Sequence, residues 1–292
     1  MAVNLDSLSI YVDVNKLDLI RETVFGPKTI GYLNLQTGVK GNTKINLIET
    51  SVNFGDGTAC GFDDNANTTF SQREIVPASV KINATFCDKK MQRYFMNHQV
   101  TVAAGRSTLP FEEHFVNSLI ESTGAQLERA IWNGVTIGGT HFNGFLDFAA
   151  DYTAVSPTAQ GTVYEKIRKA YDAIPSTSLA DTVIFIGIDK YRELAGELTA
   201  KNLYHYDPKV DEAFEMILPG TTTKVVRVPG LNGIGKGLAL NVKHAFYGTD
   251  MEGDEEVFDL WYSKDNQEWR AAINFVFGVQ VAFPSENVIV TL

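Results

Sequence analysis

The glycine-rich octapeptide at 230–237, Gly-Leu-Asn-Gly-Ile-Gly-Lys-Gly, is the part of this sequence closest to a chemical motif. It matches a phosphate-binding loop up to its last position, where Gly237 replaces the Ser or Thr that binds magnesium. Such a loop must also open a helix, whose amide groups hold the phosphate. Residues 238–242 (Leu-Ala-Leu-Asn-Val) are typical of a strand instead. A strand-to-strand loop is therefore favoured over a nucleotide site that uses Lys236.

Two groups of acidic residues contain the oxygen ligands that a hard cation prefers. The first has no basic residue within it and consists of Asp250, Glu252, Asp254, Glu255, Glu256 and Asp259. The second consists of Asp56, Asp63 and Asp64. Neither group has the spacing of an EF-hand loop. We therefore expect solvated turns, or contacts to a neighbouring molecule, and no metal site.

No catalytic constellation is recognisable among the nucleophilic and basic residues. The five histidines form no H-E-x-x-H pair, and no G-x-S-x-G motif occurs. Cys60 and Cys87 lack the C-x-x-C spacing of zinc and redox sites, which favours a role as small buried hydrophobes. We expect a protein that is not an enzyme and binds no cofactor.

Composition limits the class of protein further. The chain has 292 residues, of which 44% are hydrophobic, and a net charge of −10. These values exclude a disordered tail and argue against a protein whose main task is to bind nucleic acid or anionic lipid. Charged residues interrupt every apolar run near the N-terminus, and no window approaches the ~20 apolar residues of a spanning helix. We expect a soluble protein made in a cytoplasm, with no membrane partner.

Two N-terminal segments are predicted to lack a core of their own. Residues 1 to about 40 combine short apolar patches with breakers such as Gly26-Pro27, which indicates an extended arm. Residues 43–86 read as a long hairpin, with strand-type residues at 44–49 and 80–84 and a tip rich in Gly, Asn and Asp. Because a two-stranded ribbon is at best marginally stable alone, both segments are expected to lie against a partner.

The rest of the chain combines one long helix with α/β and β segments. Apolar residues at helical spacing between Pro110 and Gly134 predict a helix of about 24 residues, about 36 Å long. The α/β segment and the strands that follow it are predicted as a helix opened by the capping box 162–165, a strand at 182–187, a helix at 189–201, strands at 224–228 and 238–246, and a hairpin of 257–262 with 268–283. A long helix lying along a long hairpin predicts an elongated α+β molecule.

The order of these elements resembles the major capsid protein of tailed bacteriophages, the Hong Kong-97-type fold. Several short segments of the sequence also resemble capsid proteins of phages that infect Bacteroidetes-type hosts, crAss-like phages among them. The segments that carry it are 35–40 (Leu-Gln-Thr-Gly-Val-Lys), 59–62, 68–73, 86–87, 111–113, 130–134 (Ala-Ile-Trp-Asn-Gly), 247–250 and 279–284 (Val-Gln-Val-Ala-Phe-Pro). The resemblance covers nearly the whole chain.

That resemblance implies a division of the chain. Residues 1–42 would form the N-terminal arm, 43–86 the E-loop, 87–139 with 249–292 the P-domain, and 140–248 the A-domain. Arm and E-loop would reach over neighbouring subunits, and the loop at 230–237 would lie near a symmetry axis. Contacts between subunits are then expected at Leu17, Ile20, Asp56, Phe62, Phe70, Arg73, Asn232 and Lys236.

The resemblance also implies a function and partners. The chain would assemble into pentamers and hexamers of an icosahedral virion capsid, built in a bacterial cytoplasm and enclosing double-stranded DNA without sequence-specific binding. Relatives often carry a scaffolding extension before the arm; this chain begins at the arm, so a separate scaffolding protein is expected. A portal protein is expected too, and a decoration protein is left open.

Two alternatives stand beside this interpretation. An encapsulin-type compartment would share the fold and enclose a cargo enzyme in place of DNA. An enzyme that uses Lys236 on phosphate belongs to a different class, and tight ATP binding abolished by Lys236→Ala would identify it.

Overall fold

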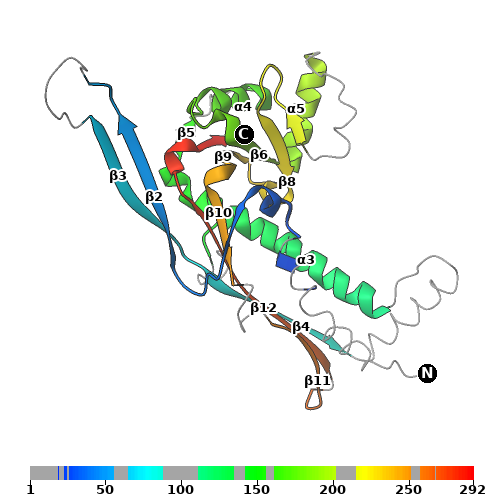
Figure 1. The fold of residues 1–292 in the computed structure, drawn as a ribbon. Helices are drawn as coiled ribbons and strands as arrows, with labels where there is room; N and C mark the ends of the chain where they lie inside the picture. Colours follow the sequence, from blue (N-terminus) through cyan, green and yellow to red (C-terminus); the bar gives the residue numbers. More distant parts are fainter. Residues whose placement is uncertain are drawn as a thin grey trace.

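The computed structural model describes residues 19, 23–24, 26–55, 65–87, 111–134, 142–155, 161–201, 215–250, 257–266 and 268–292. The molecule is elongated (Figure 1). A two-stranded ribbon extends from one side of a mixed α/β body, and a narrow sheet extends from the other side. The expectation of an elongated α+β molecule is confirmed.

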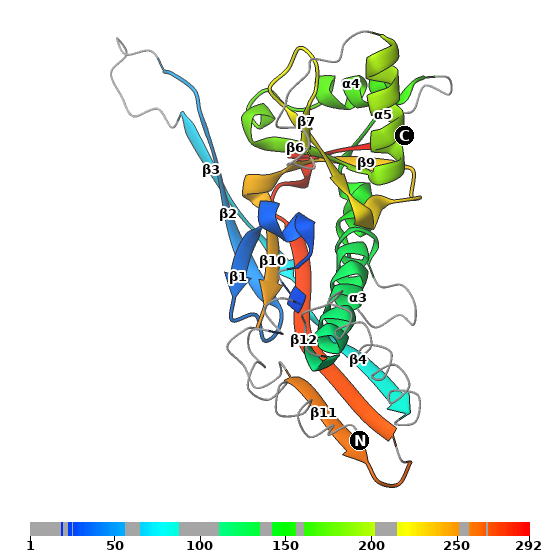
Figure 2. The same cartoon turned by 90° about the vertical axis from the view of Figure 1, so that its right-hand side faces the viewer.

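The narrow sheet has five strands and runs beside the long helix α3 (Phe111–Asn133) (Figure 2). Its order is β1-β10-β12-β11, and β4 also pairs with β12. β10 and β11 pair with successive parts of β12, and β4 pairs along the edge opposite β11. Only β1 and β10 pair in parallel. The strands are β1 (Asn34–Thr37), β10 (Ala245–Thr249), β12 (Glu268–Val281), β11 (Val257–Ser263) and β4 (Ala78–Cys87).

The second sheet has six strands in the order β5-β13-β9-β6-β8-β7. Helices α4 (Val163–Asp172) and α5 (Ile188–Ala200) bury their apolar faces against it in a separate core cluster. The strands are β5 (Thr153–Val155), β13 (Val288–Thr291), β9 (Lys236–Asn241), β6 (Thr182–Gly187), β8 (Lys224–Val228) and β7 (Glu215–Ile217). The strands predicted at 182–187 and 224–228 are confirmed.

The helix predicted between Pro110 and Gly134 is confirmed as α3. Gly134 ends it in the left-handed region, at φ 64°, and its N–H donates to the carbonyl of Ala130 at 2.8 Å. A residue with a Cβ is strained in that conformation, which is why glycine follows so many helices. The capping box that opens α4 is also confirmed, because the Thr162 hydroxyl accepts from the N–H of Glu165 and the Glu165 carboxylate accepts from the N–H of Thr162.

The predicted hairpin of 44–49 with 80–84 is wrong in its second strand. The partner of β2 (Thr43–Val52) is β3 (Ala66–Ile75), which the sequence analysis left inside the tip. Residues 80–84 belong to β4, which pairs with β12. The polar sequence of β3 shows no alternation because nearly all of its side chains are exposed, so neither face carries an apolar pattern.

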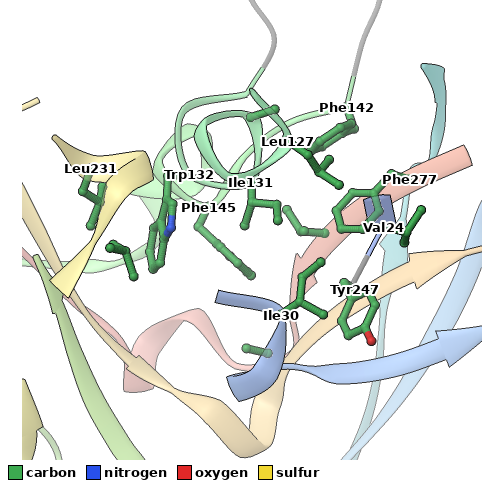
Figure 3. Close-up of a cluster of buried hydrophobic side chains, with 14 of the residues drawn as sticks. Val24, Ile30, Leu127, Ile131, Trp132, Phe142, Phe145, Leu231, Tyr247 and Phe277 are labelled. Atoms are coloured by element: carbon green, nitrogen blue, oxygen red, sulfur yellow. The ribbon is translucent and has the colours of Figure 1, made fainter. Parts of the chain in front are cut away.

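The described part of the predicted arm lies on its own subunit. The short helix η1 (Lys28–Tyr32) packs against α3, and β1 adds to the narrow sheet. Figure 3 shows Val24 and Ile30 directed into the same buried cluster as Ile131 of α3. The idea of an arm without internal support is therefore wrong for these residues, which gain a core by joining the α3 cluster.

The strand predicted at 238–246 is two strands in different sheets. β9 ends at Asn241, the short helix η5 (Val242–His244) turns the chain, and β10 begins at Ala245. The Asn241 side chain accepts from the N–H of Lys243 at 3.1 Å, the local bond with which Asn begins turns. Strand-type residues on both sides of the turn made the two strands look like one.

Candidate intersubunit surface

The ribbon formed by β2 and β3 is left largely uncovered by the rest of the chain. Its ten residue pairs run from Thr43↔Ile75 at the base to Val52↔Ala66, about 33 Å at the usual rise per residue. It projects from the body without a second layer on either face (Figure 1). Only Leu47 and Ile75, toward the base, are buried. An isolated ribbon of this length needs a partner for stability.

Strand parity gives the ribbon two different faces. Residues directly opposite in an antiparallel pair share a face, so Ile48 and Phe70 lie side by side. Val52 lies on the same face, because it is an even number of residues from Ile48. Ile48, Val52 and Phe70 are 63%, 64% and 75% exposed. We call this the outward face, since Leu47 and Ile75 are on the opposite one.

The outward face is also uncharged over most of its length. Its polar side chains bond to each other: Gln72 Nε2 donates to Asn46 Oδ1 at 2.9 Å, and the hydroxyls of Thr50 and Thr68 lie 3.2 Å apart. Lys44 and Glu74 are its charged residues, and they face each other at the base. Apolar groups with few charges are the composition of an interface core rather than of a solvated rim.

Two of the predicted contact residues lie on this ribbon, with different surroundings. Phe70 is on the outward face and free of its own subunit's core. Arg73 lies on the opposite face, where its guanidinium pairs with the Asp151 carboxylate at 3.0 Å. That ion pair joins the ribbon base to η2 (Phe145–Asp151). Arg73 thus contacts its own chain, whereas Phe70 does not contribute to that chain's core.

The other two described residues of that prediction lie in the glycine-rich loop. Asn232 Oδ1 accepts from the N–H of Asp189 at 3.3 Å, and Asp189 Oδ2 accepts from Gly233 N–H at 3.3 Å, which ties the loop to α5. Lys236 is exposed at the start of β9. The loop joins β8 to β9, so no helix follows Gly237 to hold a phosphate.

The structure brings Phe70 and Arg73 onto one element but does not bring them together with Asn232 or Lys236, which lie in the six-stranded sheet and its loop. Leu17, Ile20, Asp56 and Phe62 lie outside the described residues.

Sequence reasoning missed two exposed aromatic side chains on β11, which lie on opposite faces of the strand. Trp261 and Tyr262 are 44% and 40% exposed near the far end of the narrow sheet. Tyr262 also contacts the Trp269 ring at a centroid distance of 5.5 Å. The sequence signal for these exposed side chains was a Trp-Tyr pair just before a polar turn. Exposed aromatic side chains can mark a contact with another molecule.

A buried carboxylate holds the N-terminal segment to α3. Glu128 is 3% exposed; its carboxylate accepts from the Thr29 hydroxyl, from Thr29 N–H at 3.2 Å, and from Trp132 Nε1 at 3.4 Å. Burial raises the pKa of Glu128 above its ordinary value, although the hydrogen bonds from Thr29 and Trp132 act in the opposite direction. Nearby, Tyr32 donates to Glu215, and burial followed by this bond raises the pKa of the phenol.

The described ranges offer little that points to other chemistry. Within them, no group of three or more His, Cys, Asp or Glu side chains is arranged to hold a metal ion. Among the helices the structure describes, none is long and apolar enough to cross a membrane.

Comparison with known proteins identifies the fold. No protein-family model and no curated protein sequence matches the chain. A chain of the satellite phage P4 procapsid is similar in structure, with 10% identity, a TM-score of 0.60, and coverage of 94% of this chain and 90% of that one. A chain from the capsid of Myoviridae phage XM1 also has 10% identity and a TM-score of 0.60, with 91% of each chain covered.

A third similar structure is a virus-like particle from Pyrococcus furiosus, with 8% identity, a TM-score of 0.55, and coverage of 94% of this chain and 97% of that one. All three superpose over most of both chains. The chain therefore has the mixed helix-and-sheet fold of phage capsid proteins. At this level of identity the likeness is one of fold.

Proposed function

We propose that this chain is a major capsid protein: a structural subunit that assembles with copies of itself into the pentamers and hexamers of an icosahedral phage head. The fold shared with capsid chains supports the class. The observation that carries the proposal is the outward face of the ribbon, on which Ile48, Val52 and Phe70 are exposed and charged residues occur only at the base. A second copy is the partner that a shell subunit always has within reach.

The proposal includes the contents and partners of the shell. The head encloses double-stranded DNA without reading its sequence, and a net charge of −10 suits a wall that does not hold the packed DNA. A scaffolding protein and a portal would take part in assembly in the host cytoplasm, and the host belongs to the Bacteroidetes type. The division into arm, E-loop, P-domain and A-domain given above belongs to the same proposal.

Substitution on the outward face tests this function. Phe70→Thr keeps a residue with high strand propensity and removes the largest exposed apolar side chain of the ribbon. We expect the assembled fraction to fall at least about tenfold, because burying one aromatic side chain stabilises a contact by about 1.5–3 kcal/mol. Assembly is measured by sedimentation and electron microscopy of purified protein, with co-expressed scaffold where wild type requires it.

The matched control is Thr69→Ala, a change at the exposed neighbour on the opposite face of the same strand. It should leave the assembled fraction unchanged, and both variants should keep the melting temperature of the wild-type subunit. Wild-type yields of particles from Phe70→Thr would contradict the proposed role of the ribbon.

A compartment that encloses a cargo enzyme is the second candidate, favoured by the likeness to the Pyrococcus furiosus virus-like particle. The contents of particles purified from their natural source separate the two functions. Nucleic acid with an absorbance maximum near 260 nm indicates a phage head, whereas one co-purifying protein and little nucleic acid indicates a compartment. Neighbouring genes for terminase and portal would favour the head.

A further inference from the structure

Two glycines face each other in the narrow sheet where the ribbon leaves the body. Gly248 of β10 and Gly278 of β12 are direct partners in the strand register. Neither has a positive φ, so the conformational freedom of glycine does not explain them. Glycine inside a strand otherwise marks a place where another part of the chain approaches closely.

The ribbon base is what approaches. A Cβ on Gly248 would lie 3.0 Å from Val39 Cγ2 and 3.3 Å from Ile75 Cγ2. A Cβ on Gly278 would lie 3.0 Å from Pro77 Cα, 3.1 Å from the Val76 carbonyl oxygen and 3.2 Å from Ile75 Cγ2. Val39 and Ile75 are completely buried there. The chain segments that enter β2 and leave β3 therefore both rest on these glycines.

Hydrogen bonds fix the base in this position. Gln280, two residues beyond Gly278, donates from Nε2 to the carbonyl of Glu74 at 2.7 Å. Val39 N–H donates to the carbonyl of Thr249 at 3.4 Å. Together with the Arg73–Asp151 ion pair, these bonds attach the ribbon base to the body at three points. We call Gly248, Gly278 and Gln280 the ribbon seat.

We propose that the ribbon seat sets the direction in which the ribbon reaches a second copy of this chain, an inference that rests on the proposed shell function. The seat holds Ile75 and Val39 against the sheet, and strand parity then turns Ile48 and Phe70 away from the body. The partner surface that the ribbon meets, and hence the geometry of the shell, follows from that angle. Glycine occupies both positions because this ribbon angle brings the ribbon base too close to the sheet for a larger side chain.

Small changes at the seat are amplified at the tip. A base displaced by about 0.3–0.5 Å, over a seat about 5 Å wide, moves the end of a ribbon about 33 Å long by about 2–3 Å. Gly248→Ala and Gly278→Ala introduce such a displacement with a single methyl group. Gly196→Ala is the control, because a Cβ on this helix α5 residue would have no atom within 4 Å.

A distance measurement in the unassembled subunit tests the seat without reference to assembly. Spin labels at Ser51→Cys on the ribbon and Arg192→Cys on α5, with Cys60 and Cys87 replaced by alanine, report the ribbon angle by pulsed electron resonance. We expect Gly248→Ala and Gly278→Ala to shift the mean distance by about 2–3 Å. We expect Gly196→Ala to leave it unchanged.

Gly248→Ala and Gly278→Ala should differ in whether a second substitution, Val39→Ala, restores the distance between the spin labels. The Gly248 Cβ would meet the two side-chain methyls of Val39, which Val39→Ala removes. The double variant Gly248→Ala/Val39→Ala should therefore regain most of the wild-type distance, because only Ile75 Cγ2, at 3.3 Å, remains of the three nearest atoms. The closest contacts of Gly278 are backbone atoms, so Val39→Ala should not restore Gly278→Ala.

The yield and diameter of particles formed by the same variants test whether the ribbon seat affects assembly of the shell. We expect Gly278→Ala to lower the yield about tenfold or to change the diameter, and Gly248→Ala/Val39→Ala to return both values to wild type. Unchanged distances would overturn the seat itself, and shifted distances with wild-type particles would overturn its role in the shell. Failure of wild type to assemble would count against the proposed function alone, because the distances still test the seat.

Discussion

At the scale of single residues, the pair Glu128 and Thr29 decides where the N-terminal segment lies. Both hydrogen-bonding groups of Thr29 donate to the Glu128 carboxylate, and Trp132 Nε1 donates to the Thr29 hydroxyl at 2.8 Å. All three residues are buried. A buried carboxylate is retained in a core only where donors surround it, so the segment that carries Thr29 is bound to α3 by specific bonds as well as by apolar contact.

The raised pKa of Glu128 makes this contact depend on pH. A carboxyl whose pKa is higher in the folded chain binds its proton more tightly there, so its contribution to stability is complete at low pH and is lost as pH rises through the raised pKa. We expect wild type to lose free energy of unfolding relative to Glu128→Gln as the pH rises above the ordinary pKa of a glutamate, by at most about 1.4 kcal/mol per pH unit.

Denaturant unfolding at several pH values measures this difference. Glu121→Gln, an exposed position on the same helix, is the control and should show no such trend. A constant difference between wild type and Glu128→Gln across the pH range would contradict the raised pKa of Glu128.

At the scale of elements, the chain crosses three times between the two sheets, and one side chain ties the last two crossings together. Of these two, one joins β9 to β10, and the other joins β12 to β13 through η6 (Pro284–Glu286). Asn287 accepts from the N–H of Asn241 at 2.8 Å and donates to the carbonyl of Phe283 at 2.9 Å. His244 and Glu286 add a bond of 2.6 Å between the same two segments.

Asn287→Ala should therefore destabilise the subunit by about 1–3 kcal/mol, because it leaves the buried N–H of Asn241 without an acceptor. Thermal and denaturant unfolding measure the change. Asn232→Ala, which removes a bond of an exposed side chain, should cost less than about 0.5 kcal/mol. Equal effects of the two substitutions would show that the crossings are not tied through Asn287.

The same elements show what the sequence could predict. α3 and the capping box of α4 were predictable because helix ends and apolar stripes are local signals. β12 was predictable because it is long and apolar, although it is buried along nearly its whole length rather than on one face. The parallel pairing of β1 with β10 and the glycine pair of the ribbon seat depend on contacts between residues far apart in the chain, which no local pattern encodes.

The ribbon was predictable as a feature but not in its pairing. Its first strand alternates enough to be recognised, whereas β3 faces solvent on both sides and carries no periodic signal. Phe70 was singled out as a contact residue from the sequence, and its place on the outward face required the register. The same register was needed to show that Arg73 and Phe70 lie on opposite faces of the ribbon.

At the scale of the whole molecule, shape and charge act in opposite directions on association. The ribbon offers an extended apolar surface, and the net charge of −10 makes identical subunits repel each other. Salt screens that repulsion, since the screening length falls from about 30 Å at 0.01 M to about 8 Å at 0.15 M ionic strength.

We therefore expect association of purified subunits to become faster and more complete as ionic strength rises from about 0.01 M to 0.15 M. Light scattering at fixed protein concentration measures this, and a neutral osmolyte at matched osmolality serves as the control. Weaker association at the higher salt concentration would indicate contacts built on opposite charges, contrary to an uncharged outward face.

Cryo-electron microscopy of particles assembled from the full chain tests the central claim most directly. We expect closed icosahedral shells in which Ile48 and Phe70 of every ribbon are buried against a neighbouring copy. A chain that stays monomeric under all assembly conditions, or a shell in which the outward face of the ribbon stays open to solvent, would contradict the claim.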